Sequence, residues 1–223
     1  MLPHINDFVS IASKNIKIKG PIYEFGSYQV EGQEKNADLR PLFNDQPYFG
    51  CDIRKGKGVD LILDIQDIAL PSASVGTIIA METLEHVQHP WLAAKEIGRV
   101  LRKEDGILIA SAPMKCAIHN FPSDYWRFTP EGIKQLFDGI FDQIIIDYFG
   151  DSSFPDTVFI VGLMKNSSLT NHDKFLIERD KWRSKKIRSF DDFIKLATPP
   201  ILIPPLRSVW RSLQKGKKKY TDD

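Results

Sequence analysis

The segment Glu82-Thr83-Leu84-Glu85-His86 brings two carboxylates and an imidazole together over five residues. It follows the apolar run Val75–Met81, which is typical of a buried strand, and precedes Pro90-Trp91, where a helix is expected to begin. Open α/β sheets bind their ligands at such strand ends. Carboxylate and imidazole groups there can transfer a proton or hold a divalent cation. The sequence therefore predicts a chemical site at the end of this strand.

A second candidate group follows the apolar run Ile107–Ser111 and begins with His119. His86 and His119 are candidate general bases, because an ordinary imidazole pKa lies near neutrality. Tyr125, Trp126 and Arg127 come shortly after His119. The two aromatic side chains could form a wall for a sugar or an aromatic acceptor, and Arg127 could bind a carboxylate or phosphate. Alternatively, this stretch closes the edge of the core, with Arg127 bound to local carbonyls or Asp124.

Seven short apolar runs alternate with turn signals or helical patterns, which favours a mostly parallel α/β sheet with right-handed crossovers. The runs are Ile22–Phe25, Tyr48–Cys51, Leu61–Leu63, Val75–Met81, Ile107–Ser111, Ile144–Tyr148 and Val158–Met164. A helix is expected at Trp91–Leu101, and Thr129-Pro130 predicts the start of another. The last two runs have no clear helix between them, which suits an antiparallel hairpin.

The loop after the first run is Gly26-Ser27-Tyr28-Gln29-Val30. A dinucleotide-binding loop needs a second glycine so that a pyrophosphate can approach the backbone. Tyr28 occupies that position, which disfavours a pyrophosphate and still admits a nucleoside ligand without phosphates. Asp52 ends the second run and could accept hydrogen bonds from both ribose hydroxyls, although an Asp at a strand end is also a common turn residue.

Taken together, Tyr23–Ser27, Glu82–Val87 and Arg99–Arg102 resemble the class I S-adenosylmethionine-dependent methyltransferases, of the methyltransferase type 11 kind, over Ile22–Met164. The resemblance implies a Rossmann-like, seven-stranded, mostly parallel sheet with helices on both faces and an antiparallel last strand. It also implies S-adenosylmethionine as cofactor. The cofactor-binding residues it suggests are Glu24, Gly26, Ser27, Asp52, Ile53, Asp64, Ile65, Met81 and Glu82.

Within that set, the resemblance gives Glu24 a contact with the amino end of the methionine part, often through water. Gly26 would let the backbone approach the ligand. Asp64 would contact the adenine amino group, and the amide of Ile65 would contact the ring. Asp60 and Asp67 lie close enough in the chain to be mistaken for Asp64.

The E-x-x-E-H segment is similar to one found in ubiquinone-pathway O-methyltransferases and small-RNA 2′-O-methyltransferases. This resemblance implies that Glu82, Glu85, His86 and His119 bind a divalent metal ion. A mixed oxygen and nitrogen set suits manganese or zinc better than magnesium. In the alternative interpretation, the two glutamates cap a helix, His86 packs against Trp91, and no metal is involved.

The chain of 223 residues, with 42% hydrophobic and 11% aromatic residues, is expected to fold as residues 1–165, a cofactor-binding domain, followed by residues 166–223, a basic helical extension. Helices are expected at Asp173–Arg183, Ser189–Leu196 and Leu206–Lys215. The net charge is +1, but residues 165–223 hold 15 Lys and Arg against 7 Asp and Glu. This basic tail could touch an anionic surface, or it could form a solvated face that balances the acidic body.

The sequence has two cysteines, no signal-peptide pattern and no apolar run near the roughly 20 residues of a membrane span, so a cytoplasmic protein is expected. The predicted activity is S-adenosylmethionine-dependent methylation, with oxygen of a small molecule or glycan precursor as acceptor. One alternative is an RNA 2′-O-methyltransferase, although the acidic body and the lack of an RNA-binding module count against nucleic acid. Another is a catalytically silent, methyltransferase-like interaction protein, which the altered glycine loop would suit.

Overall fold

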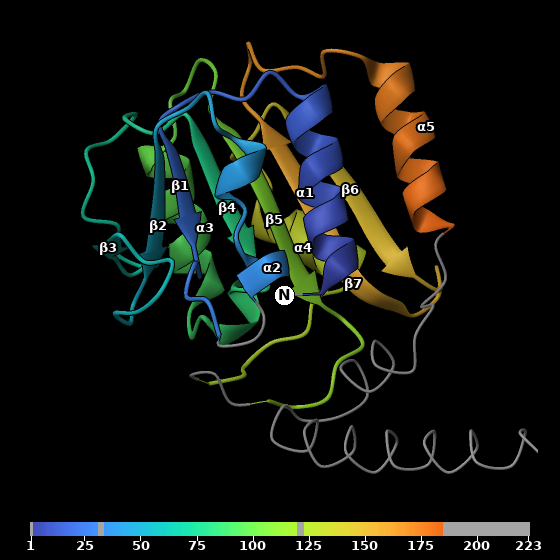
Figure 1. Cartoon of the computed structure of the whole chain (residues 1–223), viewed down its shortest axis with the longest axis horizontal. Helices are drawn as coiled ribbons and strands as arrows, with labels where there is room; N and C mark the ends of the chain where they lie inside the picture. The colour runs from blue at the N-terminus through green and yellow to red at the C-terminus, as the bar shows by residue number, and fades with distance from the viewer. Residues whose placement is uncertain (1, 31–33, 120–122, 185–223) are drawn as a thin grey trace, which may run out of the picture.

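Seven strands form one sheet in a computed structural model that describes residues 2–30, 34–119 and 123–184 (Figure 1). The strand order is β3-β2-β1-β4-β5-β7-β6. The strands are β1 (Ile22–Phe25), β2 (Tyr48–Asp52), β3 (Leu61–Ile62), β4 (Thr77–Met81), β5 (Ile107–Pro113), β6 (Gln143–Gly150) and β7 (Pro155–Leu163). The pairings among β1 to β5 are parallel, and β7 is antiparallel to both β5 and β6. The predicted Rossmann-like sheet, with its antiparallel last strand, is confirmed.

The register of the central strands determines where the site forms. Ile22 of β1 is paired with Tyr48 of β2 on one side and with Thr77 of β4 on the other. Since the three strands start level and run in the same direction, their carboxyl ends meet at one edge of the sheet. The chain therefore brings the residues that follow β1, β2 and β4 together at that edge.

Helices cover both faces of the sheet, as predicted. The helical elements are α1 (Pro3–Asn15), α2 (Glu34–Ala37), η1 (Arg40–Leu42), η2 (Leu84–His86), α3 (Pro90–Val100), α4 (Pro130–Leu136) and α5 (His172–Arg183). Figure 1 shows α1 and α5 on the near face, with α3 and α4 behind the strands. The Thr129 hydroxyl accepts a hydrogen bond from the Gly132 amide at 3.0 Å, so the predicted start of α4 is confirmed.

Helix α5 packs into the core on the α1 face. Phe175 and Trp182 are buried, and the Trp182 indole N–H donates to the backbone oxygen of His4 at 2.9 Å. Arg183 and Arg179 both reach the buried carboxylate of Asp147 on β6, at 2.5 and 3.5 Å. A domain ending at residue 165 would divide this core, so we propose that the folded domain includes α5. The helices predicted at 189–196 and 206–215 lie outside the described residues.

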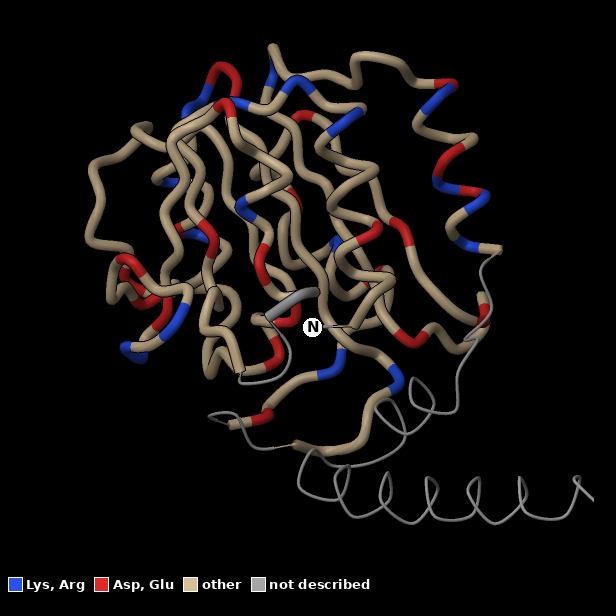
Figure 2. Tube along the Cα trace, in the orientation of Figure 1, with Lys and Arg blue, Asp and Glu red and all other residues tan. Residues whose placement is uncertain are grey.

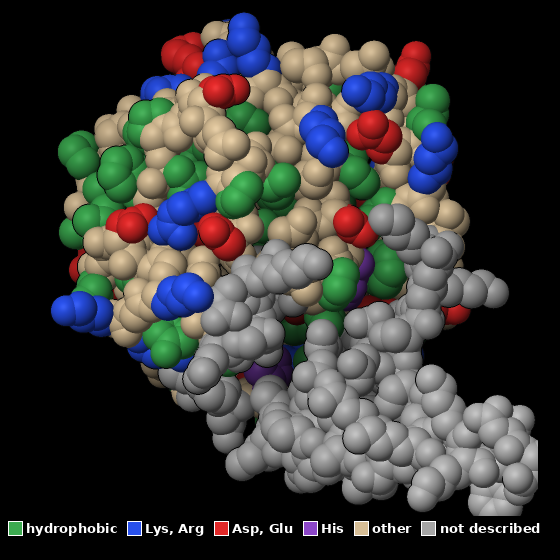
Figure 3. Space-filling model, viewed as in Figure 1, with side chains coloured by type: hydrophobic (Ala, Val, Ile, Leu, Met, Phe, Trp, Pro, Cys, Tyr) green, Lys and Arg blue, Asp and Glu red, His purple; other side chains and the backbone are tan. Residues whose placement is uncertain are grey.

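Charges of both signs are spread over the described surface. Figure 2 shows acidic and basic positions along α5, and Figure 3 shows them interspersed on the face in view, with no large block of one sign among the described side chains. Both cysteines are free, and Cys51 is buried as expected. Within the described ranges, no helix combines the length and apolar character that crossing a membrane requires.

Candidate functional site

A cavity of about 320 Å³ opens at the edge where β1, β2 and β4 end. Ten of the predicted site residues line it: Gly26, Ser27, Asp52, Ile53, Asp64, Ile65, Met81, Glu82, His86 and His119. Five do not line it: Glu24, Glu85, Tyr125, Trp126 and Arg127. The topology therefore brings most of the predicted cofactor residues together with both candidate histidines.

Gly26 is the turn residue between β1 and the cavity. Its φ is +80°, a left-handed conformation that favours glycine, and a Cβ there would lie 2.3 Å from the Thr83 hydroxyl oxygen. That hydroxyl in turn donates to the Phe25 backbone oxygen at 3.1 Å. The glycine thus allows the loops after β1 and β4 to pack closely beside the cavity.

Three acids lie around β3. Asp64 lines the cavity, and Asp60 and Asp67 do not. The Asp60 carboxylate instead accepts hydrogen bonds from the Gly50 amide and from Arg40, each at 2.7 Å. The Asp64 carboxylate accepts from the Gln66 amide at 2.8 Å, which fixes the turn that places Ile65 at the wall. This arrangement favours Asp64 among the three candidates.

Glu24, for which the resemblance implied a contact with the methionine part, often through water, does not line the cavity. It is buried, and the Tyr48 hydroxyl donates to its Oε2 at 2.8 Å. Side chains alternate along a strand, so Phe25 reaches the cavity wall and its neighbour Glu24 faces the other side of the sheet. Burial raises the pKa of Glu24 to about 7, with the Tyr48 hydrogen bond opposing the shift.

Glu24 should make the stability of the protein depend on pH. Its pKa is higher in the folded chain than in the unfolded chain, so its contribution is fully present below about pH 4.5 and is lost as the pH rises through about 7. Between pH 5 and 8, we expect wild type to lose about 2 to 3 kcal/mol of unfolding free energy relative to Glu24→Gln. Urea unfolding of both proteins across this range measures the difference. Parallel pH profiles for the two proteins would contradict it.

Glu82 follows β4 in an unusual backbone conformation, with φ at +48°. Its amide donates to the Ser111 hydroxyl oxygen at 3.1 Å, and that hydroxyl donates to Glu82 Oε1 at 3.0 Å. Burial raises the pKa of this carboxyl to about 7, against the Ser111 hydrogen bond. These contacts hold Glu82 at the cavity wall in a strained conformation, which is common at ligand sites.

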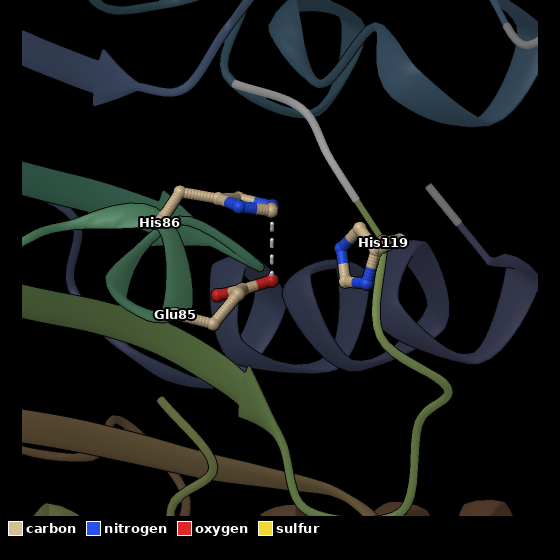
Figure 4. Close-up of side chains that lie close together, drawn as sticks. All are labelled: Glu85, His86 and His119. Carbon is tan, nitrogen blue, oxygen red and sulfur yellow. Dashed lines mark ion pairs between the residues drawn. The ribbon is translucent and has the colours of Figure 1, made fainter. Parts of the chain in front are cut away.

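Glu85, His86 and His119 point toward one another (Figure 4). One ligand atom from each lies within 4.8 Å of the others, and His86 Nε2 is 3.7 Å from Glu85 Oε1. Glu82 is not part of this group, so the structure brings together three of the four predicted metal ligands. Glu85 is buried, and its Oε2 has no hydrogen-bond partner. Burial, followed by the nearby Glu82, raises its pKa well above the usual range.

Both histidines have acceptors beside Nδ1. His86 Nδ1 lies 2.5 Å from the Ser123 backbone oxygen, and His119 Nδ1 lies 3.1 Å from that of Ala117 and 3.3 Å from Asp124 Oδ2. Because a carbonyl can only accept, Nδ1 carries the proton in the neutral ring, and Nε2 keeps its lone pair. Burial is the main cause that lowers the pKa of His86. Both Nε2 atoms are thus suited to accept a proton or bind a metal.

In the loop of residues 123–127, Arg127 makes the local contacts of the alternative interpretation, and its role in binding an acceptor stays a prediction. Its guanidinium binds both oxygens of Asp124, at 2.5 and 2.7 Å, and also donates to the Cys116 and Ala117 backbone oxygens. Burial opposes ionisation of Asp124, but hydrogen bonds from Arg127 and from the His119 amide outweigh it and lower the pKa of Asp124. Arg127 and Asp124 therefore fix the position of His119.

Tyr125 and Trp126 lie outside the cavity but next to it. Trp126 donates its indole N–H to the backbone oxygen of Val87, a cavity residue, at 2.9 Å. The Trp126 ring lies 6.1 Å from the Trp91 ring and is nearly perpendicular to it. The side chains of Trp91, Tyr125 and Trp126 are all exposed. This aromatic corner, formed by Trp91, Tyr125 and Trp126, is a surface that an acceptor could contact.

The cavity is also lined by residues that the sequence did not predict as site residues, among them the polar side chains of Tyr28, Arg54 and Thr83. The sequence pattern marks Tyr28 only as a departure from a glycine loop, and it gives Arg54 no role. The spacing Asp52-Ile53-Arg54 held a usable signal, because a side chain two residues after a strand-end carboxylate can turn back and pair with it.

Comparisons with known proteins agree with this geometry. Residues 49–110 match the model of the family described as a methyltransferase domain. No curated protein matches the chain. A Thermotoga maritima S-adenosylmethionine-dependent methyltransferase, described as a possible histamine N-methyltransferase, is 15% identical, with a TM-score of 0.52 over 73% of this chain and 89% of that one.

Two further solved structures share the fold. The CurJ carbon methyltransferase is 16% identical, with a TM-score of 0.53 over 71% of this chain and 53% of that one. The [4+2]-cyclase SpnF is 14% identical, with a TM-score of 0.50 over 71% and 80% of the two chains. The resemblance to class I S-adenosylmethionine-dependent methyltransferases is confirmed, by the family match at 49–110 and by the fold.

Proposed function

On the premise of this methyltransferase fold, we propose that the chain transfers a methyl group from S-adenosylmethionine to an oxygen of a small molecule or glycan precursor. The observation that carries the proposal is one cavity that joins the expected cofactor residues to two histidines with available Nε2 atoms. The solved relatives include proteins named for carbon methylation and for cyclisation, so the choice of an oxygen acceptor rests on the histidines.

The chain's residues divide into a holding part and a reacting part. Gly26, Asp52, Asp64 and Ile65 would hold the cofactor, which, when bound, would supply a methyl group on a positively charged sulfur. Without a metal, His119 or His86 would accept the proton of the acceptor hydroxyl at Nε2 as that oxygen takes the methyl group and S-adenosylhomocysteine leaves. Asp124 supports this role for His119, because a carboxylate beside Nδ1 orients the ring.

A divalent metal fits the group formed by Glu85, His86 and His119. Glu85 Oε2 is a buried oxygen without a partner among the described residues, and burial, followed by the nearby Glu82, raises the pKa of the carboxyl. A bound cation would stabilise the carboxylate and lower the pKa of an acceptor hydroxyl. The three donors offer one oxygen and two nitrogens, a set that suits manganese or zinc.

We predict that full-length protein binds Mn²⁺ and that Glu85→Gln weakens this binding about tenfold or more, because the buried carboxylate supplies the only charge of the group. Calorimetry or paramagnetic resonance measures the affinity without an acceptor. Glu131→Gln, at the exposed start of α4, is the matched control. If neither Mn²⁺ nor Zn²⁺ binds wild type, the metal is refuted and the histidines act as bases alone.

The convergence of Glu85, His86 and His119 also favours the second candidate, an RNA 2′-O-methyltransferase, because that resemblance implied a metal at these residues. The mixed charges on the described surface give RNA no continuous basic track on the face in Figure 3. The aromatic corner at Trp91, Tyr125 and Trp126 suits a ring-shaped acceptor whose hydroxyls stay hydrated. We therefore retain the small molecule or glycan precursor as the first candidate.

Release of S-adenosylhomocysteine during incubation with S-adenosylmethionine tests the function. The acceptors to compare are phenols, neutral oligosaccharides and short single-stranded RNAs. Turnover with a phenol or saccharide supports the first candidate, and turnover restricted to RNA supports the second. Cofactor binding without turnover on any acceptor class would favour the silent interaction protein.

A further inference from the structure

Tyr28 and Arg54 stack on each other at the cavity wall. The guanidinium carbon of Arg54 lies 4.5 Å from the centre of the Tyr28 ring, and both side chains line the cavity. The same ring packs on the backbone of Gly56, where a Cβ would lie 2.2 Å from Tyr28 Cε2. The stack therefore joins the loop after β1 to the loop after β2.

Arg54 also holds Asp52, the residue expected to recognise ribose. The Arg54 backbone amide and its Nε donate to Asp52 Oδ1, at 2.9 and 3.1 Å. The Asp52 side chain is 5% exposed, so its orientation is set by these partners and not by solvent. Two donors fill the lone pairs of Oδ1, which directs a ligand's hydroxyls to Oδ2.

We propose that Arg54 is a positioning residue for the ribose of the bound nucleoside, with Tyr28 as its support. This inference rests on the proposed function, because it assumes a nucleoside in the cavity. The guanidinium lies over the Tyr28 ring while its Nε donates to Asp52, two interactions that a lysine ammonium cannot reproduce together. The tyrosine at the second glycine position thus pre-forms the ribose end of the site before the ligand binds. With a glycine there, the ligand itself would have to order this end of the site.

The test is calorimetric binding of S-adenosylhomocysteine and of its 2′,3′-dideoxy analogue, which lacks the two ribose hydroxyls. Arg54→Ala should weaken binding of S-adenosylhomocysteine about tenfold and that of the analogue less than about twofold. Arg54→Lys should recover little of the loss. Tyr28→Ala, which removes the ring under Arg54, should also weaken binding of S-adenosylhomocysteine. Lys55→Ala, an exposed neighbour that does not line the cavity, controls for the lost positive charge.

The possible outcomes distinguish failure of the Arg54 proposal from failure of the proposed function. If Arg54→Ala weakens both ligands equally, or neither, then Arg54 does not act through the ribose and the inference is overturned. If wild type fails to bind S-adenosylhomocysteine at all, the proposed function fails and the inference fails with it. Thermal unfolding checks that each variant folds, and Arg54→Lys decides the question if Arg54→Ala does not fold.

Discussion

Replacing Asp52 by alanine should weaken the binding of S-adenosylhomocysteine by about 2 to 4 kcal/mol, the value of two charge-assisted hydrogen bonds to ribose. Asp52 lies at the end of β2, lines the cavity and is held by Arg54. The loss corresponds to roughly 30-fold to 1,000-fold in the dissociation constant. Isothermal calorimetry with the full chain measures it.

Two variants sharpen this first prediction. Asp52→Asn keeps the shape and removes the charge, so it should lie between wild type and Asp52→Ala. Asp142→Ala removes an exposed carboxylate outside the cavity and should bind like wild type. Equal affinities in wild type and Asp52→Ala would remove Asp52 from the ligand site.

The second large effect is expected at α5. A chain ending at residue 184 should unfold cooperatively, whereas a chain ending at residue 165 should lose most of its stability. The longer deletion removes the buried Trp182 and Phe175 and both arginine partners of Asp147. A buried Trp contributes about 3 to 5 kcal/mol when truncated to Ala, against a typical domain stability of about 5 to 15 kcal/mol.

Urea unfolding followed by circular dichroism compares the two truncated chains. In the full-length chain, Trp182→Ala should lower the unfolding free energy by about 3 to 5 kcal/mol, while Ile177→Ala, an exposed position on the same helix, should change it by less than about 0.5 kcal/mol. A stable, cooperatively unfolding chain of residues 1–165 would restore the boundary that the sequence suggested.

The sheet could be predicted because each strand is an apolar run bounded by turn residues. The runs beginning at Ile22 and Tyr48 match β1 and β2 almost residue for residue. The order of the last strands could be predicted only from the resemblance to the methyltransferases, because no local signal shows that β7 inserts between β5 and β6. Helix α5 was predicted at the right place, but its packing against the core was not predicted. The helix carries many charged residues and only two buried aromatic residues, so its sequence shows no clear apolar face.

The site could be predicted only where a residue's position on a strand decides its direction. Asp52 ends β2 and Gly26 directly follows β1, so their place at the cavity follows from the topology. The contact that the resemblance implied for Glu24 does not take strand alternation into account. Alternation turns Glu24 to the other face of the sheet from Phe25, where the Tyr48 hydroxyl donates to it. The local role of Arg127 likewise required the loop geometry that joins it to Asp124 and two backbone carbonyls.

The central claim, that the cavity holds S-adenosylmethionine and not a dinucleotide, is tested most directly by titrating the full-length protein with each ligand in a calorimeter. We expect S-adenosylmethionine to bind at one site per chain and to be displaced by S-adenosylhomocysteine. We expect no binding of NAD⁺, because Tyr28 stands at the second glycine position of the loop where a pyrophosphate would lie. Binding of NAD⁺ in place of S-adenosylmethionine, or of neither ligand, would contradict the account.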